Sequence, residues 1–160
     1  MDPSLAIKAA ELLTTELQRG RSEHQKRRVV SRTLSQELER VDGLILIAMN
    51  SEAAVLPTVE ELVVPAWDQH QDAIAGLFDT ATWGATKDAV TLPAQIVRQL
   101  REQQADVETR AGILDLLHKS NVLARVKLVE YTSKEGLVGT LKRAGHDDRI
   151  DRRNARLDEG

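Results

Sequence analysis

Residues 18–28, QRGRSEHQKRR, form the stretch whose residue types and spacing could do chemistry. They include five basic side chains and one glutamate, and no aliphatic residue. On a helix, Arg21, Arg28 and Arg32 fall within about 40° of one another, roughly opposite the apolar stripe that begins at Val30. Such a line of guanidinium groups could follow the phosphates of a nucleic acid or contact the carboxylates of a protein.

Three observations favour a protein surface over a nucleic acid as the contact of this stretch. No aromatic residue interleaves the basic ones, so there is no stacking platform for single strands, and no helix-turn-helix spacing follows. The chain has a net charge of −3, which opposes binding driven by phosphate neutralisation. We therefore expect a basic arm that contacts acidic protein surface, with a nucleic-acid-binding regulator using residues 19–32 as the alternative. The basic arm comprises Arg21, Lys26, Arg27, Arg28 and Arg32.

Charge is distributed unevenly along the chain. Residues 19–40 hold seven basic and three acidic side chains, whereas residues 41–110 hold four basic and eleven acidic ones. A basic first part and an acidic middle favour complementary pairing, within one chain or between two. We accordingly expect a protein partner or a homo-oligomer.

His70, with Asp68 and Asp72 on either side, is the second group that could do chemistry. A helix turns about 200° over two residues, so these carboxylates cannot converge with His70 on one metal ion. We expect His70 to be partly buried, with a ring nitrogen bonded to a backbone carbonyl. The other three histidines, His24, His118 and His146, lie in polar stretches. His24 and His118 have no second possible metal ligand nearby in sequence.

Two tryptophans complete the candidate residues. Trp67 and Trp83 are each expected in the first turn of a short helix, as packing anchors against the long helices. Their indole N–H groups would need acceptors if buried. The alternative is that one of them stays exposed and, with His70, forms part of a binding site.

The sequence contains none of the common catalytic or nucleotide-binding motifs. It has no nucleophile elbow, phosphate loop, zinc-protease motif or dinucleotide fingerprint. It also has no cysteine, which excludes thiolate metal sites and cysteine nucleophiles. We expect no metal and no cofactor, and an enzyme is the least favoured class.

The elements that position these residues are predicted to be helices, because the chain is rich in helix formers and has only four prolines. A first helix starts near Pro3. A second carries an apolar stripe, with Ser22 as its cap and Gly20 as the break before it. That stripe comprises Val30, Leu34, Leu38, Val41, Ile45 and Ala48.

Several shorter helices are predicted after residue 50. Thr58 with Glu61 suggests a capping box, Pro65 opens the next helix, and Asp79 or Thr80 caps another short one. Pro93 is expected to start a long segment that continues through Leu117, with a break left open at residues 112–121. A second capping box, Thr132 with Glu135, is predicted to start a helix that ends at Gly145.

The predicted fold is all-α: an antiparallel helical bundle or long helical hairpin with two long helices and several short ones. Residues 1–145 are expected to form a single helical domain, with residues 1–28 either part of it or a separate arm. Residues 146–160 are too polar to build a core and are expected to be a disordered tail.

The motifs of residues 24–105 resemble those of a family of uncharacterised bacterial helical proteins, especially from actinobacteria. In that pattern an arginine-rich helix precedes W-x-x-H and a second tryptophan, matched here by Trp67, His70 and Trp83. The resemblance implies a helical fold and no particular activity.

The sequence also bears on location. The N-terminus has no basic region before an apolar run, so we expect no signal peptide. The most apolar run, LILIAM, is far shorter than the roughly 20 residues that span a bilayer. We predict a cytoplasmic, non-enzymatic, helical protein–protein interaction module that self-associates through its amphipathic helices and its oppositely charged segments.

Overall fold

The computed structural model describes the backbone of residues 3–19, 22–65 and 67–155, and the side chains of residues 7–19, 22–65, 67 and 70–133. The described residues contain six helices and no strand, which confirms the all-α prediction. The helices are α1 (Pro3–Gln18), α2 (Glu23–Met49), α3 (Val59–Leu62), α4 (Trp67–Ala75), α5 (Thr80–Glu102) and α6 (Val107–Ala155).

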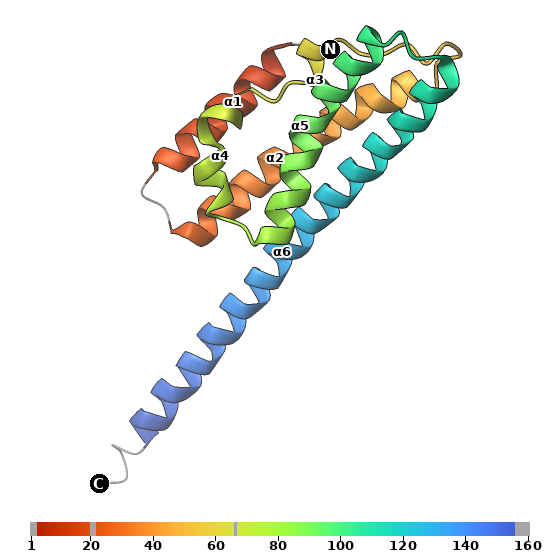
Figure 1. Ribbon diagram of the computed structural model, residues 1–160. Helices are drawn as coiled ribbons and strands as arrows, with labels where there is room; N and C mark the ends of the chain where they lie inside the picture. The colour runs from red at the N-terminus through yellow and green to blue at the C-terminus, as the bar shows by residue number, and fades with distance from the viewer. Residues whose placement is uncertain (1–2, 20–21, 66, 156–160) are drawn as a thin grey trace.

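The two long helices, α2 and α6, pack against each other and run antiparallel (Figure 1). α5 packs on α6 beside this pair, and α1 packs on α2. α4 lies against α1, and α3 joins α2 to α5. α6 is longer than the bundle, so its C-terminal part extends away from the other helices (Figure 1).

α2 forms where the sequence predicts it. The Ser22 side chain accepts a hydrogen bond from the Gln25 backbone N–H at 3.5 Å, which caps the helix, and Glu23 lies in the first turn. The predicted stripe from Val30 to Ala48 is buried throughout. It faces apolar residues of α5 and α6 in one continuous core, which includes Val90, Val97, Leu114, Leu117, Ala124 and Leu128.

The prediction that Pro93 starts a long segment is wrong. Pro93 lies inside α5 and is buried, and packing of its neighbours in the core outweighs the backbone hydrogen bond that a proline cannot make. The chain turns instead at residues 103–106, with Gln104 in the left-handed region at φ 50°. The Ala105 N–H bonds the Leu100 carbonyl at 3.1 Å, which is the closure of a Schellman motif.

Asp106 then starts α6 by accepting a hydrogen bond from the Thr109 backbone N–H at 2.7 Å. This bond holds the pKa of the Asp106 carboxyl below its usual value. The sequence does not decide whether the helix breaks at residues 112–121. In the structure α6 continues through these residues without a break.

The predicted helix start at Thr132 is also wrong. Thr132 lies within α6, and its Oγ1 contacts the Leu128 carbonyl at 2.6 Å and Ser31 Oγ at 3.0 Å. The hydroxyl therefore bonds the preceding turn of its own helix and α2, instead of capping a new helix. α6 also passes Gly145, where the sequence predicted an end, so residues 146–155 are its last turns.

Candidate protein-interaction groove

The described residues of the basic arm divide into those that bond within the chain and those that face solvent. Arg21, like Gly20, lies outside the described residues. Lys26 Nζ donates to the Leu17 carbonyl at 3.4 Å, which ties the start of α2 to the end of α1. Arg27 pairs with Glu23 on its own helix at 3.2 Å.

Arg28 and Arg32 are the exposed cations among the described residues of the basic arm. They lie one turn apart on α2, and both are exposed while Val30 and Leu34 beside them are buried, so the predicted helical register holds. Neither makes an ion pair or a side-chain hydrogen bond within the described part of the chain. Their guanidinium groups are therefore available to an acceptor from outside the bundle.

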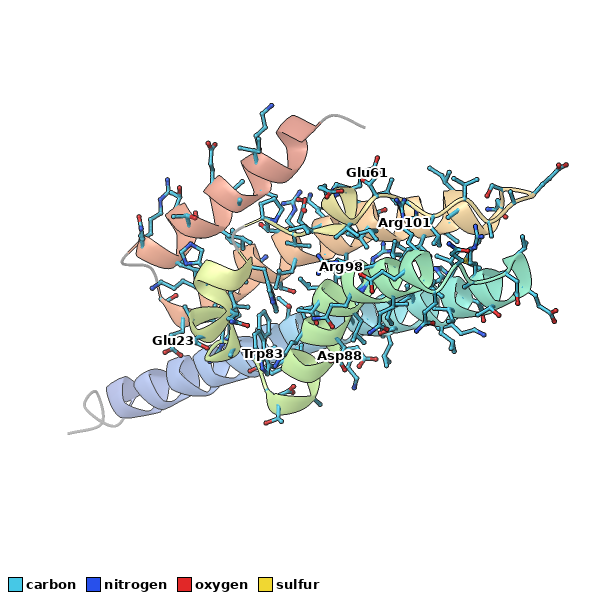
Figure 2. The ribbon with its side chains drawn as sticks, turned by 45° about the horizontal axis from the view of Figure 1, so that its top comes forward. Glu23, Glu61, Trp83, Asp88, Arg98 and Arg101 are labelled. Carbon is cyan, nitrogen blue, oxygen red and sulfur yellow. The ribbon has the colours of Figure 1, made fainter. Side chains whose placement is uncertain are left out.

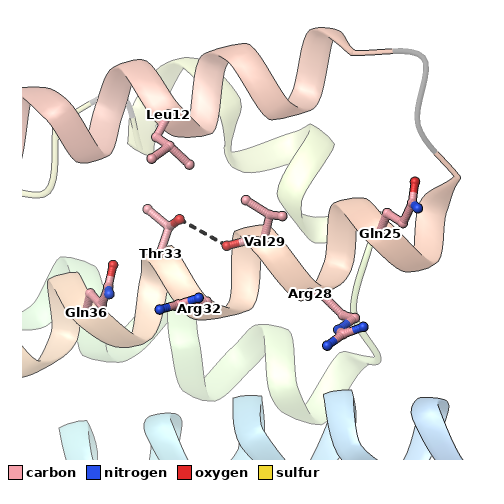
Figure 3. A pocket seen from close by; sticks show the side chains of 7 residues that line it. All are labelled: Leu12, Gln25, Arg28, Val29, Arg32, Thr33 and Gln36. Carbon is pink, nitrogen blue, oxygen red and sulfur yellow. Dashed lines mark hydrogen bonds between the residues drawn. The ribbon is translucent and has the colours of Figure 1, made fainter.

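These two arginines line a groove of about 540 Å³ between α1 and α2 (Figure 3). Leu12 points from α1 toward α2, where Val29 faces it, and these side chains form an apolar floor (Figure 3). The Thr33 hydroxyl donates to the Val29 carbonyl at 3.0 Å and is thus engaged by its own helix. The groove is lined by Leu12, Gln25, Arg28, Val29, Arg32, Thr33 and Gln36.

The polar residues of the groove follow the axis of α2. Gln25, Arg28, Arg32 and Gln36 lie at successive turns and cover about 16 Å of helix. Two exposed guanidinium groups beside an apolar contact suit a ligand that carries carboxylates next to aliphatic side chains. Sequence reasoning found the two arginines but missed Leu12 and the glutamines, because nothing in the sequence shows that α1 crosses this part of α2.

The tryptophans form a stacked pair that joins α4 to α5. Their ring centroids are 5.3 Å apart and the rings are inclined by 18°. Trp67 is 3% exposed, and its indole N–H is buried without a hydrogen-bond partner in the described chain. Trp83 is half-buried at the start of α5, next to α4 (Figure 2). α5 has 23 residues, so Trp83 does not lie in a short helix as predicted.

His70 joins α4 to α1 and is half-buried. Its Nε2 lies 3.0 Å from Thr14 Oγ1, a hydroxyl instead of the backbone carbonyl that the sequence led us to expect. The Thr14 hydroxyl donates its single proton to the Ala10 carbonyl at 2.9 Å. His70 Nε2 must therefore carry the proton in its contact with Thr14.

A polar cluster at the seam of α2 and α6 was missed by sequence reasoning. His118 Nδ1 lies 2.7 Å from Asp42 Oδ1, and Asp42 is buried. Arg125 lies 3.9 Å from Asp42 and 3.7 Å from Glu39. The cluster was missed because its partners come from distant parts of the chain. Asp42, one turn after Leu38 in the buried stripe, is the signal that could have pointed to it, because a buried carboxylate needs a partner.

The described residues contain no group of three or more histidine or acidic side chains placed to hold a metal ion. Over the described residues, none of the helices is long and apolar enough to cross a membrane. Comparison of the chain with protein-family models, curated proteins and solved structures gave no match. The resemblance of residues 24–105 to bacterial helical proteins thus stays a prediction.

Proposed function

We propose that the protein is a non-enzymatic helical interaction module that binds an acidic helical segment of a partner protein in the α1–α2 groove and also self-associates through its long helices. The first part rests on Arg28 and Arg32, which are exposed, make no ion pair within the described residues and lie beside the apolar side chains of Leu12 and Val29. A helix that lays carboxylates on the arginines and aliphatic side chains on the floor matches both halves of this lining.

The free charges of the groove favour a protein over a nucleic acid. Among the described residues of the basic arm, Lys26 and Arg27 bond within the chain, which leaves Arg28 and Arg32. Two phosphate contacts would give a slope of only about −1.8 in a plot of log affinity against log salt on duplex DNA. That is a small fraction of the electrostatic attraction that nucleic-acid-binding proteins use.

The arginines are expected to act as a pair. An exposed ion pair contributes at most about 1 kcal/mol, so two arginines supply about 2 kcal/mol, or roughly 30-fold in affinity. The rest must come from apolar contact with Leu12 and Val29. A partner with carboxylates alone is therefore expected to bind weakly, and a partner with both features more tightly.

Fluorescence anisotropy with a labelled helical peptide tests the groove. The peptide carries glutamates at i and i+4 and leucines on the adjoining face, and a second peptide has glutamine in place of the glutamates. We expect saturable binding of the first peptide, lost in R28E/R32E. The matched control is K87E/R98E, which changes the net charge equally at exposed positions on α5 (Arg98 is labelled in Figure 2).

Three outcomes would contradict this use of the groove. They are equal binding of the two peptides, equal loss in the control variant, and retention of the wild-type protein on duplex DNA or RNA at affinities above those for the acidic peptide. The last outcome would favour the nucleic-acid-binding alternative.

Self-association is tested separately by analytical ultracentrifugation over a range of protein and salt concentrations. A reversible oligomer is expected. A monomer at every concentration would remove self-association and leave the groove untouched.

A further inference from the structure

α6 has apolar side chains on the side that faces away from the bundle. α2 and α5 cover one side of this helix, with Leu114, Asn121 and Leu128 fully buried there. A helix in a small soluble bundle is ordinarily polar on its outer side. On α6 the outer side instead exposes large apolar residues over residues 116–129: Leu116, Val122, Leu123, Val126 and Val129.

The centre of this outer side is a short alternation of charged and apolar residues. At about 100° per residue, Lys119, Leu123, Val126 and Glu130 fall within about 60° of one another, and lie opposite the buried side. Leu123 is 53% exposed and Val126 is 47% exposed. Within the described residues Glu130 makes no ion pair, and Lys119 makes one, with Asp115 one turn earlier, at 2.5 Å.

We propose that α6 pairs with α6 of a second copy, antiparallel, across a two-fold axis that passes between Ala124 and Arg125. This pairing rests on the self-association part of the proposed function. In this register Leu123 packs against the partner's Val126, and the two-fold axis repeats the contact. Lys119 faces the partner's Glu130 on either side of this apolar centre.

The arrangement of charge selects the antiparallel direction. In a parallel pair with residues at equal heights, Lys119 would face the partner's Lys119, and Glu130 would face the partner's Glu130. Each of these like-charge contacts is unfavourable. In the antiparallel pair every one of these charges meets an opposite one, and Val122 lies beside the partner's Val129 along one edge.

Two further properties of α6 suit a second copy as the occupant. The surface is self-complementary about one axis, as a two-fold interface requires. Its centre line lies opposite the buried side of α6 by helical period, so the two bundles would lie on opposite sides of the helix pair, and its Val122–Val129 edge borders a groove shared with Ser35 of α2. The Lys119–Asp115 contact is an exposed i,i+4 pair and is weak enough for Lys119 to exchange it.

Charge exchange tests the pairing, with the dimer dissociation constant measured by sedimentation velocity. Lys119→Glu and Glu130→Lys alone should each weaken dimerisation by at least tenfold, and the double variant should restore it. Val126→Asp should give a monomer, whereas the control Ile47→Asp, 67% exposed on α2, should leave the dimer unchanged. Far-ultraviolet circular dichroism confirms that each variant is folded.

Disulfide formation tests the direction, since the chain has no cysteine of its own. A mixture of Lys119→Cys and Glu130→Cys should give the mixed dimer on oxidation, because the antiparallel register places these two positions opposite each other. Glu130→Cys alone should not crosslink, since its two copies would lie at opposite ends of the contact. Crosslinking of Glu130→Cys with itself would overturn the antiparallel direction.

The results also separate this pairing from self-association in general. A wild-type dimer that all α6 variants leave intact would overturn the α6 contact, while self-association through another surface would stand. A wild-type monomer at every concentration would overturn both, and the groove between α1 and α2 would still be judged by its own peptide assay.

Discussion

Replacement of Asn121 by leucine is expected to stabilise the protein, although Asn121 is fully buried at the centre of the core. Its Nδ2 donates to the Leu38 carbonyl of α2 at 2.9 Å, but its Oδ1 is buried without a partner in the described chain. The side chain thus gains one hydrogen bond and leaves one acceptor unsatisfied.

The magnitude follows from these two contributions. Loss of the hydrogen bond to Leu38 costs about 0.5–1.5 kcal/mol, whereas removal of a buried unsatisfied acceptor relieves about 1–3 kcal/mol. Leucine has a similar shape, and the Leu38 carbonyl keeps its bond within α2. We expect Asn121→Leu to raise the free energy of unfolding by about 1 kcal/mol.

Asn121→Asp is the matched contrast, since it keeps the size and removes the donor. It buries an uncompensated charge beside a carbonyl and should lower the free energy of unfolding by about 3 kcal/mol or more. Guanidinium chloride unfolding followed by circular dichroism at neutral pH measures both. If Asn121→Leu is less stable than the wild type by 1 kcal/mol or more, Oδ1 has a partner and the reasoning is wrong.

Three further predictions concern the helices and the aromatic pair. Pro93→Ala should stabilise α5 by about 1 kcal/mol in thermal unfolding, because the roughly 3 kcal/mol cost of an internal proline exceeds the packing lost with its ring; destabilisation would contradict this. Hydrogen bonds from the Thr58 backbone N–H and hydroxyl hold the pKa of the Glu61 carboxyl below its usual value. The wild type is therefore expected to have a higher free energy of unfolding than Glu61→Gln at pH above the ordinary carboxyl pKa. This difference should be lost as the pH falls through the lowered pKa of Glu61. A difference that does not change with pH would contradict the role of the ionised carboxylate. Trp83→Phe should leave a blue-shifted emission from the buried Trp67, compared with the emission of Trp67→Phe, and equal spectra would contradict the difference in burial.

The fold class and the register of α2 could be predicted from the sequence because both depend on local periodicity. The stripe from Val30 to Ala48 repeats at helical spacing, and Ser22 and the Thr58–Glu61 capping box mark helix starts by side-chain chemistry alone. The ends of α5 and α6 could not be predicted in this way. Gln104 takes the left-handed position where glycine is the usual signal, and buried Pro93 is held in α5 by tertiary packing.

Only the part of the candidate site that lies on α2 could be predicted from the sequence. The spacing of Arg28 and Arg32 placed them outside the core, and they are exposed. Leu12 belongs to another helix, so its position over Val29 depends on how α1 crosses α2, which no local pattern encodes. The same limit applies to His118 and Asp42, which meet only because α6 runs antiparallel to α2.

Charge exchange across the groove tests the proposed function most directly. Fluorescence anisotropy would compare the glutamate peptide and a lysine counterpart, each against the wild-type protein and R28E/R32E. We predict that the wild type binds the glutamate peptide with at least 30-fold higher affinity than the lysine peptide, and that R28E/R32E reverses this preference. Leu12→Asp should lower the affinity for both peptides. If R28E/R32E binds the glutamate peptide as tightly as the wild type, or if neither protein binds either peptide, the groove is not the partner site.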